Sequence, residues 1–333
     1  MIRKLIVVSV ALCLILVPLF SGITMAAPEH QKNTSQNITI VTPQGKIEIA
    51  KKVGLGEWPL YSVESWGPKP QAARGRLGEA LPEGGERYAV AAGISDYPGI
   101  ELDIYYAADD AVAMSYILVD LYGFDEVQCF VDEDATRDNI LGAIEDVKEM
   151  ANENDEVVFF FSGHGAKLTP HFGQGQVGIV TWGQVEPEFI WDRELKRAFE
   201  GLETDRVAFI FDCCLAGGMI DLAKTGRIIG MASTQNGYAV EYGEVYGPPI
   251  EIPGIEEPTF INHGLFTYFF AVCGMQHRMA DFYDHDGDPE TQDVTFEEAF
   301  DLSRQYLIWI HDVVPEIWQI STIGDCFPND MLP

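Results

Sequence analysis

The sequence predicts an α/β fold, a three-layer αβα sandwich with a mostly parallel central sheet over residues 87–333. Two observations support this prediction. From Arg87 onward, short apolar segments alternate with amphipathic helical segments, an order that implies parallel strands joined by right-handed crossovers. The predicted strands are also apolar on both faces, so helices must cover both sides of the sheet.

Each element of this fold is predicted from its own residues. The first helix has an apolar face and ends at Gly123, a typical C-terminal glycine. Thr136 is a favourable N-cap for a second helix that extends to about Asn152, and Asp192 is placed at the N-cap of a third helix. Strands are predicted at residues 87–93, 126–131, 156–161, 206–211 and 226–233.

The N-terminal residues differ from this pattern. Arg3 and Lys4 precede an apolar run and small residues, which together indicate a secretory signal peptide over residues 1–26, with a retained membrane anchor as the alternative. Residues 27–86 are rich in Pro, Gly, Gln and Lys and show no sustained period, so we interpret them as a pro-segment or linker, or more simply a solvated tether. The domain that follows is expected to be exported and extracellular or at the cell surface, without a stable membrane span once the signal is removed.

Composition restricts the partners of the chain. The net charge of −31 disfavours nucleic acid and anionic lipid as partners and favours basic peptides.

Of the six cysteines, Cys13 lies in the predicted signal, which leaves five, an odd number in an exported chain. At least one thiol is therefore expected to be free and is a candidate reactive group. The oligomeric state is not predicted.

Two strands end in residues that carry chemistry. The third predicted strand is followed by Ser162-Gly163-His164-Gly165, and the fourth ends in "FDCCLAGG", which contains Cys213 and Cys214. If the strands are neighbours, an imidazole at one strand end can activate a thiol at the other. The alternatives are a plain turn at the histidine and a structural cysteine pair. A metal site is disfavoured because no further Cys/His pair has ligand spacing.

These motifs resemble the caspase–legumain–clostripain group of cysteine peptidases, most closely metacaspases and prokaryotic caspase-like proteins. A histidine about 50 residues before the cysteine is a known caspase signature. The family patterns S-G-H-G and D-x-C-x-S-G correspond here to residues 162–165 and 212–217, with Leu215-Ala216 where His-Ser is common. The resemblance covers roughly residues 87–310 and includes residues 262–273 as a helix that follows the later strands.

The resemblance implies roles for individual residues. His164 is the expected general acid/base and Cys214 the expected nucleophile, with Cys213 as the competing candidate on the opposite face of the strand. The backbone N–H groups of Gly165 and Cys214 would form the oxyanion hole. The implied reaction passes through a thioester and requires no metal or other cofactor.

An acidic pocket is expected for the substrate residue that precedes the cleaved bond. Asp212 stands two residues before Cys214, and the matching acid in metacaspases helps bind Arg or Lys, so cleavage after Arg or Lys is predicted. Asp192 and Asp96 are weaker candidates for the same pocket, and Asp192 is more simply a helix cap. Arg74 and Arg76 are hypothetical self-cleavage sites.

A carboxylate-rich loop suggests a bound Ca²⁺. Asp284, Asp286 and Asp288 alternate as in the first half of an EF-hand loop, with Glu298 as a later ligand. Glu298 falls after the twelfth position of such a loop, and Pro289 stands where glycine is required. The alternative is an acidic surface turn before a helix over residues 294–310.

The sequence therefore predicts an exported cysteine endopeptidase that acts on proteins or peptides with basic residues. One alternative is a catalytically inactive caspase-like fold that serves as a binding module at the cell surface. A second is a transpeptidase or ligase with the same Cys-His dyad, because hydrolysis and acyl transfer share the thioester.

Overall fold

The computed structural model describes residues 38–54, 78–283, 294–314 and 319–333. The predicted signal peptide, the hypothetical cleavage sites Arg74 and Arg76, and the candidate ligands Asp284, Asp286 and Asp288 lie outside the described residues. All described residues belong to one compact unit of the chain, residues 34–333.

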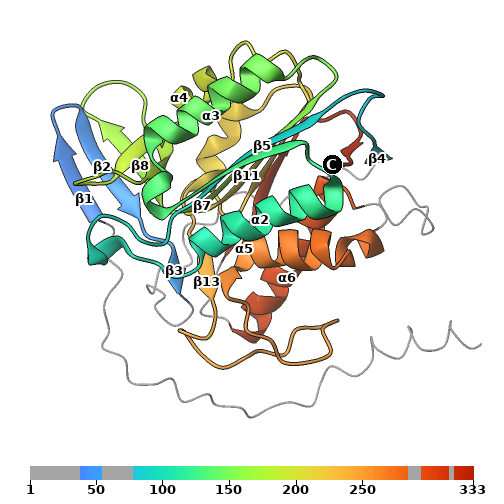
Figure 1. Cartoon of the computed structure of the whole chain (residues 1–333). Helices are drawn as coiled ribbons and strands as arrows, with labels where there is room; N and C mark the ends of the chain where they lie inside the picture. Colours follow the sequence, from blue (N-terminus) through green and yellow to red (C-terminus); the bar gives the residue numbers. More distant parts are fainter. Residues whose placement is uncertain (1–37, 55–77, 284–293, 315–318) are drawn as a thin grey trace, which may run out of the picture. The chain divides into compact units, whose positions relative to one another are not determined.

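The central sheet has six strands in the order β15-β12-β11-β7-β5-β6 (Figure 1). Its five parallel strands are the five that the sequence predicts, and β15 is an antiparallel edge strand. The strands are β5 (Arg87–Gly93), β6 (Glu126–Val131), β7 (Glu156–Gly163), β11 (Val207–Cys213), β12 (Arg227–Met231) and β15 (Thr322–Asp325).

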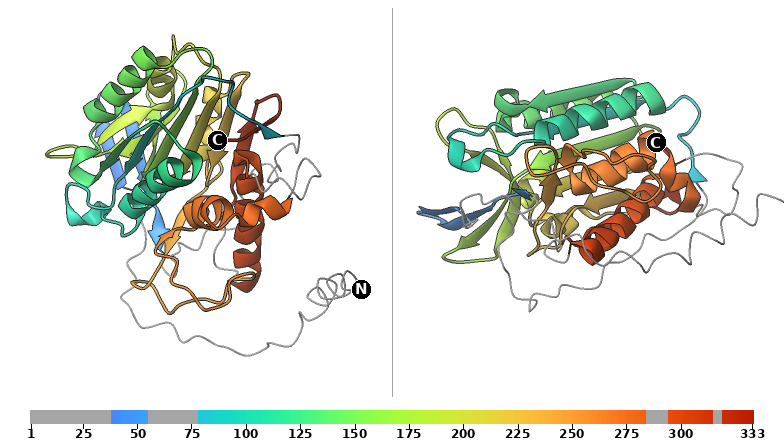
Figure 2. Two further views of the ribbon diagram at one scale, coloured as in Figure 1. Left: turned by 45° about the vertical axis from the view of Figure 1, so that its right-hand side comes forward. Right: turned by 90° about the horizontal axis from the view of Figure 1, so that it is seen from below.

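Helices cover both faces of this sheet, which confirms the three-layer prediction (Figures 1 and 2). The helix α2, the π-helix η4 and the helix α6 pack on one face, and α3 and α4 pack on the other. The helices are α2 (Ala107–Tyr122), α3 (Arg137–Met150), α4 (Asp192–Ala198), α5 (Leu265–Thr267), η4 (Tyr268–Gln276) and α6 (Phe296–Val313).

The helix ends agree with the sequence at two positions and differ at one. Gly123 adopts a left-handed conformation with φ of 66° at the end of α2. The Thr136 hydroxyl accepts a hydrogen bond from the backbone N–H of Asn139, as an N-cap does. The prediction for Asp192 was wrong in detail: the N-cap of α4 is Trp191, and Asp192 is the first helical residue.

Alternate residues of the central strands enter opposite cores. On β7, Val158 and Phe160 contact the layer that contains α2 and α6, whereas Phe159 and Phe161 contact the layer that contains α3 and α4. All eight residues of β7 are buried. Full burial on both faces is what a central strand of a covered parallel sheet requires, and it fixes the position of the residues that follow the strand.

The segment interpreted as a linker is partly folded. β1 (Ile38–Thr42) and β2 (Gly45–Ala50) form a hairpin whose second strand pairs antiparallel with β8 (Gly165–Pro170). β9 (Gln176–Thr181) and β10 (Glu188–Trp191) complete this second sheet. Ile47 and Ile49 alternate with polar residues and face the core, a short period-two pattern that the sequence analysis missed.

Short strands and turns complete the fold. β3 (Val53–Gly54) pairs parallel with β13 (Val240–Tyr242), which pairs antiparallel with β14 (His263–Gly264). β4 (Gly78–Glu79) pairs with β16 (Asp330–Met331), and a 3-10 helix, η3 (Ala216–Leu222), follows β11. In the part of the chain that the structure describes, no helix has the length and apolar character needed to cross a membrane.

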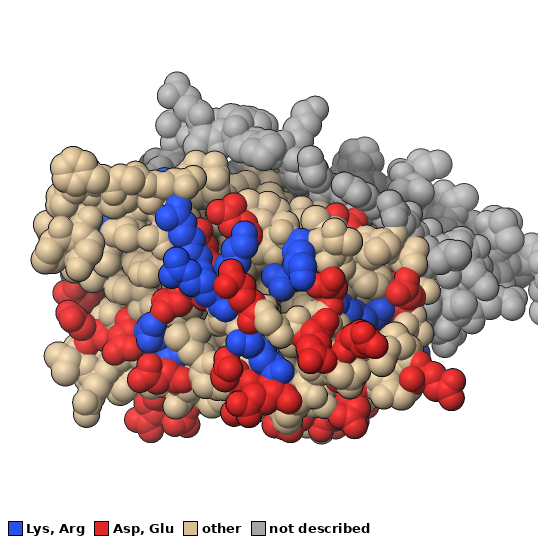
Figure 3. Space-filling model, turned by 90° about the horizontal axis from the view of Figure 1, so that it is seen from above, with Lys and Arg blue, Asp and Glu red and all other residues tan. Residues whose placement is uncertain are grey.

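Basic side chains gather on the layer of α3 and α4 (Figure 3). Lys148, Arg193 and Arg197 line a hollow of about 620 Å³ there, together with Glu145 and Glu194. Basic and acidic groups are therefore mixed on this face, even though the whole chain carries a net charge of −31.

Candidate active site

The register of the central sheet brings the two motifs together. β7 and β11 are adjacent parallel strands in which Ser162 pairs with Asp212 and Gly163 pairs with Cys213. His164 and Cys214, each the next residue along its strand, therefore leave the sheet side by side at its carboxyl edge. The predicted proximity of the two strand ends is confirmed.

Gly165 allows the two chain segments to approach each other. A Cβ atom at this position would lie 1.8 Å from the carbonyl oxygen of Cys214, which no side chain tolerates. Leu215 then adopts a left-handed backbone conformation with φ of 62°, so the chain turns sharply after the thiol. The oxyanion hole predicted at the N–H groups of Gly165 and Cys214 stays a prediction, but their backbones are in direct contact.

The imidazole of His164 is fully buried and held on three sides. The Tyr97 ring stacks on it with centroids 4.7 Å apart, and the Tyr97 hydroxyl accepts a hydrogen bond from the His164 backbone N–H at 3.0 Å. Nδ1 accepts a hydrogen bond from the backbone N–H of Lys52 at 2.9 Å. Nε2 therefore carries the proton and donates a hydrogen bond to the Leu102 carbonyl at 2.6 Å. Burial lowers the pKa of His164 to about 3, so the ring is neutral.

The thiol of Cys214 faces the same space. It donates a hydrogen bond to the Lys51 carbonyl at 3.2 Å, and the sulfur accepts one from the backbone N–H of Ala239 at 3.3 Å. Burial raises the pKa of this thiol to about 12, so it is protonated as the structure stands. Cys213 is packed in the opposite core, as the alternation of a strand requires.

A buried cation pocket adjoins the thiol and is filled by Lys52. Its ammonium lies 2.9 Å from Oδ1 of Asp212 and 3.3 Å from Oδ2 of Asp110. It also donates to the Ser162 hydroxyl at 3.0 Å, and that hydroxyl donates to Asp110 at 2.6 Å. All of these side chains are buried, so the pocket recognises a primary ammonium with two carboxylates and one hydroxyl.

The charges in the pocket depend on one another. Burial opposes the charge on Lys52, but Asp212, Asp110 and Glu241 outweigh it and hold the pKa of the ammonium above its usual range. Burial also acts against ionisation of Asp110, yet Lys52 and His263 hold the pKa of that carboxyl below its usual value. Burial raises the pKa of Asp212, and although Lys52 lowers it, the nearby charge of Asp110 raises it further.

Neighbouring residues fix both carboxylates. Oδ2 of Asp212 accepts hydrogen bonds from the backbone N–H and the hydroxyl of Thr267, at 2.9 and 2.7 Å. Asp110 accepts hydrogen bonds from the backbone N–H of Gly264 at 3.0 Å and from Nδ1 of His263 at 2.9 Å. A Cβ atom at Gly264 would lie 2.2 Å from Asp212 and 2.4 Å from the Lys52 ammonium, so the pocket requires glycine there.

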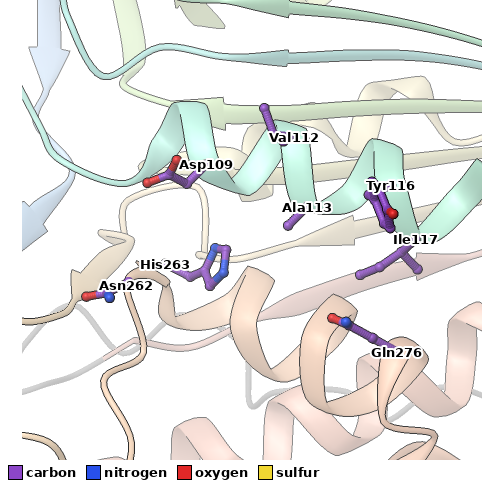
Figure 4. Close-up of a pocket in the computed structure, with 8 residues that line it drawn as sticks. All are labelled: Asp109, Val112, Ala113, Tyr116, Ile117, Asn262, His263 and Gln276. Atoms are coloured by element: carbon purple, nitrogen blue, oxygen red, sulfur yellow. The ribbon is translucent and has the colours of Figure 1, made fainter.

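His263 connects the pocket to an open groove between α2 and η4 (Figure 4). The groove has a volume of about 400 Å³ and is lined by Asp109, Tyr116 and Gln276 among others. The His263 ring is partly exposed on this side while its Nδ1 binds the buried Asp110. His263 therefore links the groove to the buried carboxylate of Asp110.

Sequence reasoning identified Asp212 but missed the other groups of the pocket. Asp110 follows another aspartate in an amphipathic helix, where a solvated surface charge is the simpler interpretation. Ser162 and Gly264 lie in segments that were assigned to a strand end and a helix. The one available signal is that Ser162 stands two residues before His164, as Asp212 stands two before Cys214.

The structure places the remaining predicted residues elsewhere. Among the described residues, the ion pairs of Lys52 are with Asp110 and Asp212, and neither Asp96 nor Asp192 joins them. Asp96 is exposed and donates its backbone N–H to Asp132 at 2.9 Å. Asp192 is buried in the first turn of α4, in the layer that contains α3.

Glu298 has a structural task in α6. Its carboxylate accepts a hydrogen bond from the backbone N–H of Thr295 at 3.0 Å, and Thr295 caps the Glu298 N–H in return, which is a capping box. Among the described residues, no group of three acidic, histidine or cysteine side chains could hold a metal. The calcium loop itself stays a prediction because its aspartates lie outside those residues.

The fold and this site together define a caspase-like cysteine peptidase domain. The family model for the caspase domain of C14 peptidases matches residues 86–285, which is more than half of the chain. The chain therefore belongs to the caspase-domain family, and the resemblance inferred from its two motifs is confirmed.

Curated relatives are metacaspases. Metacaspase-4 from Arabidopsis thaliana is 32% identical over 146 residues, which cover 41% of this chain and 35% of that protein. Metacaspase-1A from Neurospora crassa is 28% identical over 173 residues, which cover 44% of this chain and 37% of that protein. The matches thus span little more than a third of the length of these relatives. A crystal structure of a Geobacter sulfurreducens protein aligns with this chain with a TM-score of 0.42 and 14% sequence identity. The alignment covers 58% of this chain and 83% of that protein, and the likeness is too weak to carry an argument.

Proposed function

We propose that this protein is a cysteine endopeptidase that hydrolyses peptide bonds after Arg or Lys, with Cys214 as the nucleophile and His164 as the general acid/base. The observation that carries the proposal is the buried ammonium of Lys52 between Asp110 and Asp212, in a pocket beside the Cys214 thiol. Lys52 thus stands in for the side chain of a substrate residue.

The pocket favours basic side chains for an electrostatic reason. Two buried carboxylates attract an ammonium or guanidinium, and they repel a substrate Asp or Glu. A neutral side chain would leave no ammonium or guanidinium between the two carboxylates, which is costly for buried charges. Selection for Arg or Lys therefore follows from Asp110 and Asp212 acting together.

The dyad supplies the chemistry once it is free. His164 takes the proton of Cys214, and the thiolate attacks the carbonyl carbon of the substrate. The bond between that carbon and nitrogen breaks as the imidazolium gives its proton to the leaving amine, and a thioester remains. Water, deprotonated by His164, then hydrolyses the thioester and regenerates the thiol.

The remaining predictions accompany this function. Export through the N-terminal signal peptide places the enzyme outside the cell, where calcium is abundant. Binding of Ca²⁺ at Asp284, Asp286 and Asp288 is proposed on the spacing of these carboxylates alone. The chemistry at Cys214 requires no metal, so calcium would act on stability or on assembly of the site.

The experiment compares peptides that differ only in the residue before the cleaved bond. Full-length protein, its Lys52→Ala variant and the Lys52→Ala/Cys214→Ala double variant are assayed with fluorogenic peptides ending in Arg, Lys, Asp or Asn, with and without Ca²⁺. Lys52→Ala is included because Lys52 itself fills the pocket.

We expect the Lys52→Ala variant to hydrolyse the Arg and Lys peptides and the double variant to hydrolyse none. Hydrolysis after Asp or Asn would keep the enzyme and overturn the role of the acidic pocket. No hydrolysis of any peptide would favour the catalytically inactive binding module. Product bearing an added amine nucleophile in place of water would favour the transpeptidase.

A further inference from the structure

The acceptors of the acidic pocket converge on a single nitrogen atom. The Lys52 ammonium lies 2.9 Å from Oδ1 of Asp212, 3.3 Å from Oδ2 of Asp110 and 3.0 Å from the Ser162 hydroxyl. The backbone carbonyl oxygen of Asp212 adds a fourth contact at 3.3 Å. Four oxygens thus surround one atom, and each carboxylate contacts it through one of its two oxygens.

The second oxygen of each carboxylate is already engaged by the domain. Oδ1 of Asp110 accepts hydrogen bonds from Nδ1 of His263 at 2.9 Å and from the backbone N–H of Gly264 at 3.0 Å. Oδ2 of Asp212 accepts hydrogen bonds from the backbone N–H and the hydroxyl of Thr267, at 2.9 and 2.7 Å. These donors fix the rotation of both carboxylates. Neither carboxylate can turn two oxygens toward a ligand without losing hydrogen bonds inside a buried site.

The backbone of Gly264 closes the end of the pocket. A Cβ atom there would lie 2.4 Å from the Lys52 ammonium and 2.9 Å from Oδ2 of Asp110. The outer nitrogens of an arginine side chain lie one bond farther from Cα than the nitrogen of a lysine. A guanidinium carbon at the position of the ammonium would therefore bring those nitrogens against the walls of the pocket. The pocket has room for an ammonium and little room beyond it.

An ammonium and a guanidinium require different arrangements of acceptors. The three N–H donors of an ammonium diverge from one atom, whereas a guanidinium spreads its donors in a plane and binds a carboxylate best through two parallel hydrogen bonds. Asp110 and Asp212 each offer one oxygen to the ligand, so neither can form that pair of bonds. A bound guanidinium would leave buried N–H groups without acceptors, which is costly.

We propose that the pocket selects Lys over Arg as the residue before the cleaved bond, with His263 and Thr267 as the positioning residues that set this preference. The preference rests on the proposed function, because it concerns the same pocket and the same reaction. His263 is the more accessible of the two, since its ring is partly exposed in the groove between α2 and η4 (Figure 4). It can therefore be replaced without opening the buried pocket from inside.

Kinetics with two peptides that differ only in Lys or Arg test the preference. They are measured in the Lys52→Ala background, because Lys52 otherwise fills the pocket. We expect kcat/KM to be about tenfold higher for the Lys peptide, which corresponds to the loss of one charge-assisted hydrogen bond. His263→Ala releases Oδ1 of Asp110, so kcat/KM for the Arg peptide should rise relative to that for the Lys peptide.

Two further variants separate positioning from general damage to the site. His263→Asn retains an N–H donor at the position of Nδ1 and should keep the preference for Lys. Thr267→Val removes only the hydroxyl donor to Asp212 and should reduce the preference, as His263→Ala does. A merely structural role of either residue would lower kcat/KM for both peptides equally and leave their ratio unchanged, and that result contradicts the positioning role.

The same preference is measurable without any peptidase activity, because Lys52 itself lies in the pocket. Lys52→Arg places a guanidinium there, and urea unfolding of the full-length protein reports the cost. We expect a lower urea midpoint for Lys52→Arg than for the native protein, and a smaller difference between the two in the His263→Ala background. Lys46→Arg is the matched control, because Lys46 is an exposed lysine of β2 that pairs with Glu48, and its midpoint should equal the native one.

The two measurements distinguish this preference from the proposed function. A lower midpoint for Lys52→Arg together with faster hydrolysis of the Lys peptide supports both. A lower midpoint without hydrolysis of any peptide supports an ammonium-selective pocket and contradicts the peptidase. Hydrolysis of the Arg peptide with equal or higher kcat/KM overturns the preference and keeps the peptidase. A native-like midpoint for Lys52→Arg also overturns the preference, because the pocket then accepts a guanidinium equally well.

Discussion

Two parts of the molecule meet in the candidate site but are held there by different means. One is the pair of strand ends that carry His164 and Cys214, and the other is the segment of residues 45–54. The two catalytic residues follow fully buried strands whose pairing fixes their register. Residues 45–54 are fixed by contacts with distant parts of the chain. The ammonium of Lys52 alone bonds to residues 58, 110 and 160 positions away in the sequence.

This difference separates what is permanent in the site from what can be removed. The dyad cannot leave its place without breaking the central sheet. The segment lies outside the central sheet, because β2 belongs to the second sheet and β3 to a third, so its displacement leaves the central sheet intact. In this structure the pocket holds the side chain of Lys52, and in the proposed function it holds the basic side chain of a substrate.

The largest effect is expected from the pocket carboxylate nearest the ammonium. In the Lys52→Ala background, Asp212→Asn should lower kcat/KM for Arg and Lys peptides by about 100-fold, because loss of one partner of a buried charge pair costs about 2–5 kcal/mol. Asp110→Asn should have a similar or smaller effect, since its contact with the ammonium is longer, 3.3 Å against 2.9 Å. Steady-state kinetics measure both.

Asp192→Asn is the matched control for these variants. Asp192 is also a buried carboxylate of the domain, but it lies in α4 and outside the pocket. Its substitution should leave the preference for basic over neutral peptides unchanged. If Asp192→Asn lowers that preference as much as Asp212→Asn does, the pocket has been assigned to the wrong carboxylates.

A smaller effect is expected in the pH dependence of stability. Burial depresses the pKa of His164 in the folded state to about 3, whereas an unfolded histidine titrates near pH 6.5. The stability due to the neutral ring is therefore complete above about pH 6.5 and is lost as the pH falls toward 3. Between pH 7 and pH 5 the loss should be about 2 kcal/mol, and His164→Gln should lack it.

Urea unfolding at several pH values provides this measurement. The native protein should lose more stability on acidification than His164→Gln, and the two curves should converge below pH 6. Lys52→Ala should behave like His164→Gln if the segment leaves and the imidazole regains contact with water. Parallel pH dependence of native protein and His164→Gln would contradict the buried neutral imidazole.

The sequence was sufficient for elements whose signal is local. The five parallel strands, the main helices and the pairing of His164 with Cys214 were predicted, because apolar runs and the residues after them identify buried strand ends. Asp212 was found from its position two residues before Cys214. In each case a few adjacent residues contain the whole pattern.

The missed residues depend on packing between segments far apart in the chain. Asp110 gives no sign of burial in its own helix, and only its contacts with Lys52, Ser162 and His263 identify it as part of the pocket. The strand before Lys52 has only six residues and lies in a segment rich in turn-forming residues, so its alternation was not recognised. No local rule indicates that this lysine enters an acidic pocket.

The most direct test of the central claim is covalent trapping of the nucleophile. Peptide chloromethyl ketones that differ only in a terminal Arg or Asp are incubated with Lys52→Ala, with Lys52→Ala/Cys213→Ala and with Lys52→Ala/Cys214→Ala, and adducts are located by mass spectrometry. The structure predicts a single adduct on Cys214, formed with the Arg reagent and retained when Cys213 is replaced. An adduct on Cys213, or equal reaction with the Asp reagent, would contradict the assignment of the nucleophile or of its acidic pocket.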